Sequence, residues 1–323
     1  MRQLLFYQNI VALDKVRHQS LELVDKFNLD FAKSINFIPI LHTELTKVAQ
    51  ELPIVFLKSG DTEFALAAVV GLRDKENLQI KDGNWVGRYI PAFIRRYPFI
   101  TLSQPDNPAQ FFIAIDEEAS CLIDSKNKKK AGQGSEPLFE GEAPSKKIQQ
   151  VLPFLQKYHL EHRNTIHFCQ QLSDLQLLSS SNLKIQSKSG QTYQVNGVWI
   201  IEEANLKKLL PEVLHQLLSD GVLSKIIEHQ FSLNHFTSLT EKVSELHSHS
   251  NIAKSPKLKG VDKKIPTKLV SSSSRASVPK KNVKSKVVRK SAKVLVEAKK
   301  TPMKKTNIAA KTPAKSRAKK SFR

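Results

Sequence analysis

The chain has 323 residues, with 51 lysines and arginines against 30 aspartates and glutamates, and a formal net charge of +21. Its two cysteines, Cys121 and Cys169, are too few and too far apart for a disulfide framework or a cysteine-based zinc site. The apolar runs are shorter than the roughly 18 residues that a membrane span needs, and the N-terminal segment lacks the cleavage site of a signal peptide. We therefore expect a reduced, cytoplasmic protein.

The positive charge lies in the last quarter of the chain. Residues 251–323 contain 24 lysines and arginines and 2 acidic residues, a net charge of +22, and subtraction from the totals leaves 27 basic and 28 acidic residues, a net of −1, in residues 1–250. A segment so rich in Lys, Ala, Ser and Pro buries too little apolar surface to offset its chain entropy. We therefore predict a globular domain over 1–250, large enough for a sizeable core, and a disordered basic tail over 251–323.

Strand patterns dominate the first half of the domain. Thr43 is placed to cap a helix that reaches Glu51, and Ser59-Gly60-Asp61 and Asp82-Gly83 are hairpin turn signals. Apolar or alternating runs predict strands at Leu4–Tyr7, Phe37–Leu41, Ile54–Leu57, Phe64–Leu72, Leu78–Ile80, Phe99–Leu102 and Gln110–Ile115.

The segment Trp85–Phe99 concentrates aromatic, proline and arginine residues, reading W-V-G-R-Y-I-P-A-F-I-R-R-Y-P-F. Pro91 suits the first turn of a helix, and Pro98 disfavours helix at the residue before it, so we predict a short helix over Pro91–Arg96. On a helical wheel the apolar residues share one face, which we expect to be buried. That face comprises Ile90, Phe93, Ile94 and Tyr97; Arg95 falls opposite it, and Arg88 does too if the first turn reaches back that far.

The arginines of this segment have two interpretations. Arg88, Arg95 and Arg96 are candidates for binding an anion or an acidic partner, because a guanidinium presents a planar set of donors to carboxylates and phosphates. The alternative is a structural ion pair with carboxylates of the same domain, for which the candidates are Asp116, Glu117 and Glu118. These carboxylates could also serve acid–base chemistry or a hard cation, but successive strand residues point to opposite faces and do not easily converge.

Local motifs for catalysis are absent from the sequence, which contains no G-x-S-x-G, P-loop, G-x-G-x-x-G or H-E-x-x-H pattern. We therefore predict no catalytic residue, no cofactor and no metal site. An enzyme whose catalytic residues meet only in three dimensions stays open as an alternative.

The second half begins with a predicted surface loop, Ser125–Lys147, which includes Lys128–Lys130 and from which Leu138 and Phe139 can pack back on the domain. The clearest helix follows over Lys146–Leu178. Its apolar stripe comprises Ile148, Val151, Leu155, Tyr158, His162, Ile166, Cys169 and Leu172.

Histidines on this helix suggest a metal site at first sight. His159 and His162 are one turn apart and could share a metal ion, but His167 lies about 140° from His162 around the helix. We therefore interpret His162 as a core or interface histidine.

The remaining elements complete the domain. Leu183–Ile201 resembles a β-meander with turns at Ser189-Gly190 and Asn196-Gly197. Asn205 is a candidate helix cap, Gly221 a helix end, and Val222–Phe236 has helical spacing. The predicted fold class is α+β, with a strand-rich N-terminal half, a long amphipathic helix, a small β-meander and C-terminal helices.

The basic tail has the composition for binding a polyanion. Phe322 is its only aromatic residue, so it is not equipped to stack on bases. We predict non-specific attraction to DNA, RNA or an anionic polysaccharide; a solubilising extension without a dedicated partner is the alternative. The predicted contacts are Lys280, Lys281, Lys284, Lys286, Arg289, Lys290, Lys299, Lys300, Lys304, Lys305, Lys311, Lys315, Arg317, Lys319 and Lys320.

Several short stretches of the domain, taken in chain order, form a recognisable combination. They are L-L-F-Y (Leu4–Tyr7), P-I-V-F (Pro53–Phe56), G-L-R-D (Gly71–Asp74), E-N-L (Glu76–Leu78), Trp85–Phe99 and I-D-E-E (Ile115–Glu118). Over roughly Met1–Thr240 the chain resembles the bacterial SapC family, and the tail does not take part in the resemblance. The resemblance implies a protein named for association with a surface layer, and it supplies no catalytic residues.

Three functions are compatible with these observations. The first is a non-enzymatic SapC-like binding protein whose tail tethers it to a polyanion. The second, which the resemblance implies, is a surface-layer or cell-envelope component, which would need an export route. The third is an enzyme or enzyme accessory with an anion site near Arg88 and Arg95.

Overall fold

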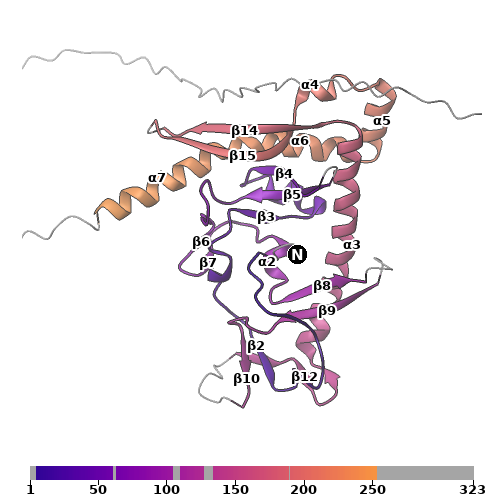
Figure 1. Ribbon diagram of the computed structural model, residues 1–323, viewed down its shortest axis with the longest axis vertical. Coiled ribbons are helices and arrows are strands. Elements are labelled where there is room, and N and C mark those ends of the chain that lie inside the picture. The colour runs from indigo at the N-terminus through magenta and orange to yellow at the C-terminus, as the bar shows by residue number, and fades with distance from the viewer. Residues whose placement is uncertain (1–4, 61–62, 105–109, 127–133, 189, 253–323) are drawn as a thin grey trace, which may run out of the picture.

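The computed structural model describes residues 5–60, 63–104, 110–126, 134–188 and 190–252, and it has the predicted α+β fold (Figure 1). The larger sheet is antiparallel with strand order β14-β15-β4-β5-β3. Its strands are β3 (Phe37–Pro39), β4 (Ile54–Lys58), β5 (Phe64–Val69), β14 (Leu178–Gln186) and β15 (Thr192–Ile201). The first three residues of β4 are fully buried, so both faces of the sheet are covered at its centre.

Two three-stranded sheets in the described part of the chain, which we call the smaller sheets, form the other end of the domain. One has the order β1-β9-β8, from β1 (Ile10–Ala12), β8 (Phe99–Ser103) and β9 (Phe111–Asp116), and another has the order β10-β2-β11, from β2 (Leu21–Val24), β10 (Leu122–Asp124) and β11 (Ser135–Pro137). Two-stranded pairs are formed by β6 (Ile80–Lys81) with β7 (Asn84–Trp85) and by β12 (Phe139–Glu140) with β13 (Ala143–Pro144).

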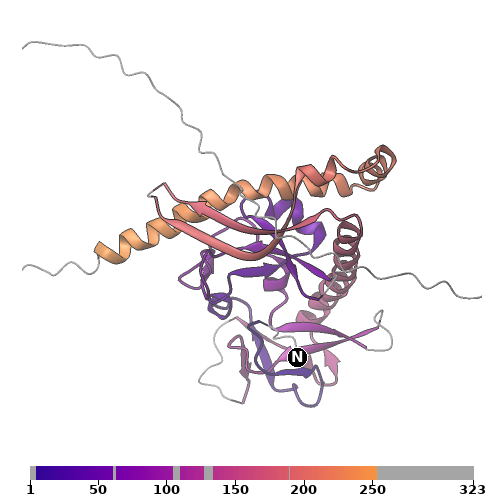
Figure 2. The same cartoon turned by 45° about the horizontal axis from the view of Figure 1, so that its top comes forward.

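Helices pack against these sheets. Helices α6 (Val222–Ser232) and α7 (Phe236–Ile252) contact β14, β15 and β4, and α1 (Leu45–Val48) packs on α6 (Figures 1 and 2). The short helices are α2 (Ala92–Arg95), α4 (Glu203–Leu206), α5 (Pro211–Ser219) and the 3-10 turns η1 (Asp30–Ala32), η2 (His42–Glu44) and η3 (Leu233–His235). None of the helices within the described ranges is long and apolar enough to cross a bilayer.

Helix α3 (Lys146–Asp174) joins two separate hydrophobic clusters (Figure 1). Ser145 caps it through a hydrogen bond from the Ile148 N–H. Near its start Ile148 and Leu155 are buried in the cluster of the smaller sheets, and near its end Phe168 and Leu172 are buried in the cluster of the larger sheet. The helix therefore fixes the two ends of the domain relative to each other.

Because α3 serves two clusters, its buried face rotates along its length. At roughly 100° per residue around the helix axis, the buried residues in the first half of α3 face one direction. Thr165, Phe168 and Leu172, which are buried in the second half, face a direction about a quarter-turn away. His162 and Ile166, which the predicted stripe includes, are exposed for this reason, with 53 % of Ile166 accessible. The prediction of one continuous stripe was wrong at these two residues.

Several turn and packing predictions are confirmed. Strands β4 and β5 pair as a hairpin, and Asp82 and Gly83 form the turn between β6 and β7 with φ angles of +50° and +74°. Leu138 packs back on the domain and is fully buried. The loop Ser125–Lys147 contains β11, β12 and β13, and Lys128–Lys130 lie outside the described residues.

Other local predictions were wrong. Residues 5–7 of the predicted strand Leu4–Tyr7 are not a strand, and the first strand within the described residues is β1. The helix at α1 is entered through η2, and the Glu44 side chain, rather than Thr43, accepts the Leu41 N–H at 2.8 Å. Asn205 lies within α4 and donates to the Ser179 hydroxyl at 2.9 Å, because its side chain joins α4 to β14.

The predicted meander is present as the antiparallel strands β14 and β15, but Asn196-Gly197 is not its second turn. The dipeptide lies inside β15 at a change of register between Ser181 and Leu183. Asn196 and Gly197 together oppose the single residue Asn182 of β14, and this arrangement is a β-bulge. Gly197 has the φ of +70° that such a position requires. A turn dipeptide can therefore mark a bulge as well as a hairpin.

The apolar face predicted for the short helix is buried at three of its four residues. Phe93 and Ile94 of α2 and Tyr97 just after it are buried, Ile90 is half-buried, and Phe93 packs edge-on against Phe6 with ring centroids 5.4 Å apart. These contacts place Phe93 in the core of the domain.

We expect Phe93→Ala to lower the free energy of unfolding by about 3–5 kcal/mol, because it removes a buried ring and leaves a cavity. Urea denaturation of the full-length protein measures the loss. The matched control is Phe112→Ala, since Phe112 is 44 % exposed in β9 and should cost far less. Equal losses for the two variants would show that Phe93 is not a core residue.

A second prediction concerns pH. His229 is buried against Phe56, its Nε2 accepts the Ile201 N–H at 3.1 Å, and burial lowers the pKa of the ring to about 3. The unfolded chain, with a histidine pKa near 6.5, takes up this proton first, so the stabilising effect is complete above about pH 6.5 and is lost as the pH falls toward 3.

Between pH 6.5 and pH 4.5 the wild-type protein should therefore lose about 2–3 kcal/mol more stability than His229→Gln, at about 1.4 kcal/mol per pH unit. Urea titrations at the two pH values give the difference. His42, whose pKa burial also lowers, is present in both proteins and cancels. Parallel pH dependence in the two proteins would contradict the burial of a neutral His229.

Candidate functional site

The segment Trp85–Phe99 is held in place by two carboxylates of the preceding helical region. The buried Glu44 accepts hydrogen bonds from the Ala92 N–H at 2.8 Å and the Tyr89 hydroxyl at 2.7 Å. Glu51 accepts the N–H groups of Arg88 and Tyr89 at 2.8 and 2.9 Å. These bonds fix the entry to α2, and with it the positions of the arginines that follow.

The three candidate arginines occupy different environments. Arg88 is exposed, and its hydrogen bond to Glu51 uses the backbone N–H rather than the guanidinium. Arg95 is exposed at the end of α2, where Nε donates to the Ile90 carbonyl at 2.9 Å and Nη2 to the Tyr89 hydroxyl at 3.0 Å. Arg96, in contrast, is only 7 % exposed. The structure therefore brings Arg95 and Arg96 together and leaves Arg88 apart.

The buried Arg96 guanidinium lies among aromatic rings. Its central carbon is 4.3 Å from the ring centre of Phe93, 4.7 Å from that of Tyr158 and 5.6 Å from that of Tyr7. Burial raises the pKa of Tyr7 to about 12, an effect that the positive charge of Arg96 opposes. Tyr7 therefore stays a neutral phenol, and the rings present their negatively polarised faces to the cation.

Arg95 and Arg96 line a small cleft that we call the Arg96 cleft. It has a volume of about 170 Å³ and lies between the end of β2, the end of α2 and the first turns of α3. Lys147 and Asp25 complete its charged lining, and its rings are Phe27, Tyr97, Phe99 and Phe154.

Sequence reasoning identified the two arginines of the cleft but missed Lys147, Asp25 and Phe154. These residues lie some 50 or more positions away in the chain, and only the packing of α3 and β2 against α2 brings them near. The basic character of the first turn of α3 was the one available signal.

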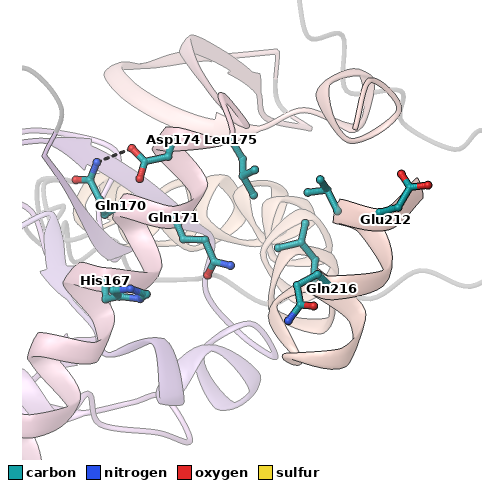
Figure 3. A pocket seen from close by; sticks show the side chains of 9 residues that line it. His167, Gln170, Gln171, Asp174, Leu175, Glu212 and Gln216 are labelled. Atoms are coloured by element: carbon teal, nitrogen blue, oxygen red, sulfur yellow. Dashed lines mark hydrogen bonds between the residues drawn. The ribbon is translucent and has the colours of Figure 1, made fainter. Parts of the chain in front are cut away.

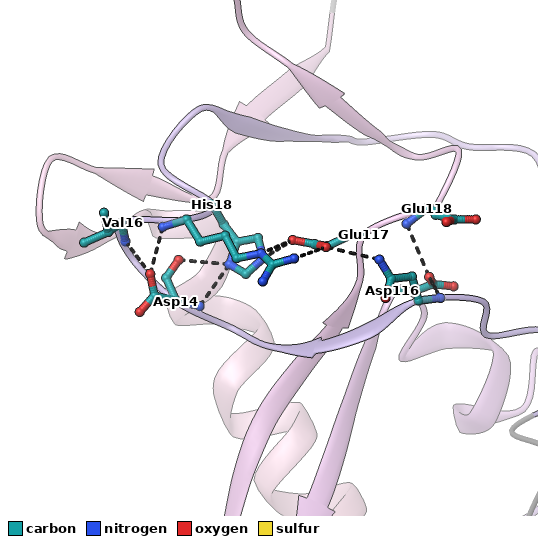
Figure 4. Close-up of polar contacts among 8 residues, drawn as sticks. Asp14, Val16, His18, Asp116, Glu117 and Glu118 are labelled. Carbon is teal, nitrogen blue, oxygen red and sulfur yellow. Dashed lines mark hydrogen bonds and ion pairs between the residues drawn. The ribbon is translucent and has the colours of Figure 1, made fainter.

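Among the described residues, the carboxylates Asp116, Glu117 and Glu118 form no ion pair with these arginines, and Figure 4 shows the partners that Asp116 and Glu117 have instead. Asp116 is fully buried and accepts backbone N–H groups from Gln8 and Asn9 at 3.0 and 2.9 Å. Glu117 points the other way and forms a two-bond ion pair with Arg17, at 2.5 and 2.6 Å. The predicted divergence of successive strand side chains is present here.

Glu117 also contacts the buried His18, whose Nε2 lies 3.1 Å from Oε1 (Figure 4). The other ring nitrogen of His18 lies 2.9 Å from both the N–H and the carbonyl oxygen of Asp14. Among the described residues, one ring nitrogen is thus engaged by Glu117 and the other by the backbone of Asp14, with no serine or cysteine at either. We interpret Asp14, His18 and Glu117 as a structural network.

The cysteines and the histidines of α3 are further chemically reactive residues that the structure describes. Burial raises the pKa values of Cys121 and Cys169 to about 12, so both stay protonated thiols. His159 is buried and stacks on Phe111 with ring centres 4.3 Å apart, whereas His162 is exposed. Across the described ranges, no three His, Cys, Asp or Glu side chains gather as a metal site.

A larger groove of about 520 Å³ runs between the end of α3 and α5 (Figure 3). Leu175, Val213 and Leu217 give it an apolar lining, and Gln171 and Gln216 face each other across it. Its lining contains no lysine or arginine. It is therefore less suited to an anion than the Arg96 cleft.

Comparison with known proteins adds one finding to this geometry. The family model SapC matches residues 13–239, a range that contains the Arg96 cleft, α3 and the whole larger sheet. No curated protein and no solved structure matches the chain. Since the match covers more than half of the sequence, the chain belongs to the SapC family.

Proposed function

We propose that the protein is a non-enzymatic binding protein whose C-terminal segment, residues 251–323, tethers it to a polyanion such as nucleic acid. The observation that carries the proposal is the division of charge, with +22 in these residues and −1 in the remainder. A body close to neutrality gains little from long-range attraction to a polyanion, so the attraction is assigned to the segment.

Charge pairing within the body supports this division. Arg17 pairs with Glu117, Lys147 with Asp25 and Lys207 with Glu203. These cations are partly neutralised before any ligand approaches. The tail, by contrast, contains 24 basic residues against Asp262 and Glu297.

The composition of the tail also indicates how it would bind. Lysine and arginine neutralise phosphates and release counterions, which gives affinity without sequence preference. With Phe322 as the one aromatic residue of the tail, base stacking is not available as a second source of affinity. We therefore propose a partner recognised by its charge density, met in the cytoplasm.

The first test is binding of duplex DNA by the full-length protein as the salt concentration is varied. If about 8 phosphates are neutralised at once, the slope of log K against log salt concentration should be near −7, about 0.9 for each phosphate. Duplexes of unrelated sequence should bind equally, and heparin should compete. A slope near zero would rule out electrostatic tethering.

The matched control keeps the chain length and changes only the charge. In this variant the fifteen predicted contacts from Lys280 to Lys320 are replaced by glutamine, which should reduce affinity by several orders of magnitude at low salt. Equal binding by the variant would assign the DNA contact to the body. Fractionation of native cells with and without nuclease then separates nucleic acid from an envelope glycan as the partner.

The second test addresses the independence of the body. A chain ending at Ile252, the last residue of α7, should melt at the same temperature and with the same cooperativity as the full-length protein, because every buried residue identified in the core lies before this point. Calorimetry of the two proteins makes the comparison. A broad transition in the shortened chain would show that the tail takes part in folding.

A further inference from the structure

The Arg96 cleft carries an excess of positive charge. Its lining contains Arg95, Arg96 and Lys147 against one carboxylate, Asp25, which leaves a net charge of +2. Asp25 forms an ion pair with Lys147, and Glu136 lies 3.6 Å from the same ammonium group. Lys147 is therefore neutralised within the protein, and the uncompensated charges belong to Arg95 and Arg96.

Arg96 is unusual because it is buried without a carboxylate. Removing a guanidinium from water is costly unless it is paired, yet among the described residues no aspartate or glutamate forms an ion pair with Arg96. Its Nε has no hydrogen-bond partner among the described residues, although its guanidinium shares a hydrogen bond with the Tyr7 hydroxyl. The surrounding rings of Phe93, Tyr158 and Tyr7 compensate only part of this cost.

Arg95 lies at the exposed side of the same cleft, and some of its N–H donors are not used by the hydrogen bonds described above. Of its five N–H groups, the Ile90 carbonyl and the Tyr89 hydroxyl take one each. Its guanidinium lies over the Phe154 ring, 5.3 Å from the ring centre, which holds it beside the cleft. The exposed Arg95 and the buried Arg96 thus both line the cleft that a single anion would enter.

The remaining walls are apolar and restrict the size of a ligand. Phe27, Phe99 and Val151 line the cleft, whose volume of about 170 Å³ is close to the roughly 150 Å³ of an apolar cavity that accepts benzene. Such a space suits one ring or a short branched chain. A strongly hydrated inorganic anion would leave these walls uncovered.

We propose that the Arg96 cleft binds a small organic carboxylate, with the carboxylate on Arg95 and Arg96 and a ring-sized apolar group against Phe27, Phe99 and Val151. The proposal concerns the body alone and does not depend on the tail. The carboxylate of the ligand would serve as the anionic partner that Arg96 does not have within the described part of the protein.

Benzoate is the probe, titrated into the full-length protein at 0.15 M salt and followed by amide chemical shifts. We expect saturable shifts around Tyr97 and Val151 with a Kd at or below about 1 mM, a value in reach of a ligand of this size. Benzamide, which has the same shape without the charge, and inorganic phosphate, which has the charge without the ring, should each bind at least roughly tenfold more weakly.

Variants locate the binding. Arg95→Gln removes an exposed charge of the cleft, and Val151→Trp fills the cleft while keeping its charges; each should raise the Kd for benzoate at least roughly tenfold. The matched control is Arg88→Gln, an exposed arginine of the same segment that does not line the cleft. It should leave the Kd within about twofold, and unchanged melting temperatures confirm that the variants are folded.

Each contrary result overturns the proposal. Absence of saturable binding, or equal binding of benzamide, would exclude carboxylate recognition. Binding of phosphate without benzoate would identify a simple anion site instead. An equal loss in Arg88→Gln and Arg95→Gln would indicate general surface charge. Because the tail is unchanged in all three variants, these outcomes are separate from those of the DNA titration.

Discussion

The arrangement of this domain depends on one buried carboxylate. Glu44 accepts the N–H groups of Leu41 and Ala92 and the hydroxyl of Tyr89, and so joins η2 to the start of α2. A buried carboxylate is stable only when such donors surround it. The Tyr89 hydroxyl accepts in turn from Arg95, so the position of an exposed guanidinium is set by a residue fully inside the protein.

A second constraint comes from the way the domain is divided. The larger sheet and the smaller sheets have separate hydrophobic clusters, and α3 contributes residues to both. The Arg96 cleft lies where α2, β2 and the first turns of α3 meet. The residues that line the cleft come from three distant segments, all of which lie within the range matched by the SapC family model. The cleft is a product of the packing of these elements, and none of them could form it alone.

The sequence predicted what depends on local chemistry and failed where distant packing decides. Asp82-Gly83 was a correct turn because both residues adopt the positive φ angles that the hairpin requires, whereas in Asn196-Gly197 only the glycine has a positive φ and it lies inside a strand. The helical wheel correctly predicted that Phe93 is buried. It could not show that Arg96 lies among aromatic rings, since Tyr7 and Tyr158 come from other segments. For the same reason Lys147 could not be assigned to the cleft. Residues 253–323, with all fifteen predicted tail contacts, lie outside the described residues.

The double attachment of α3 has a consequence for how related sequences can vary. Its 29 residues span about 44 Å, and several exposed residues, such as Lys157, Arg163 and Asn164, lie on its outer face. The type of residue can change at these positions. The length of α3 cannot change in the same way, because inserting or deleting one residue between the two clusters would turn one end of the domain by about 100° and shift it by about 1.5 Å relative to the other end. The number of residues in the middle of α3 thus fixes the distance and the rotation between the two ends of the domain. Sequence alignments within the family should therefore have no gaps in this part of the helix.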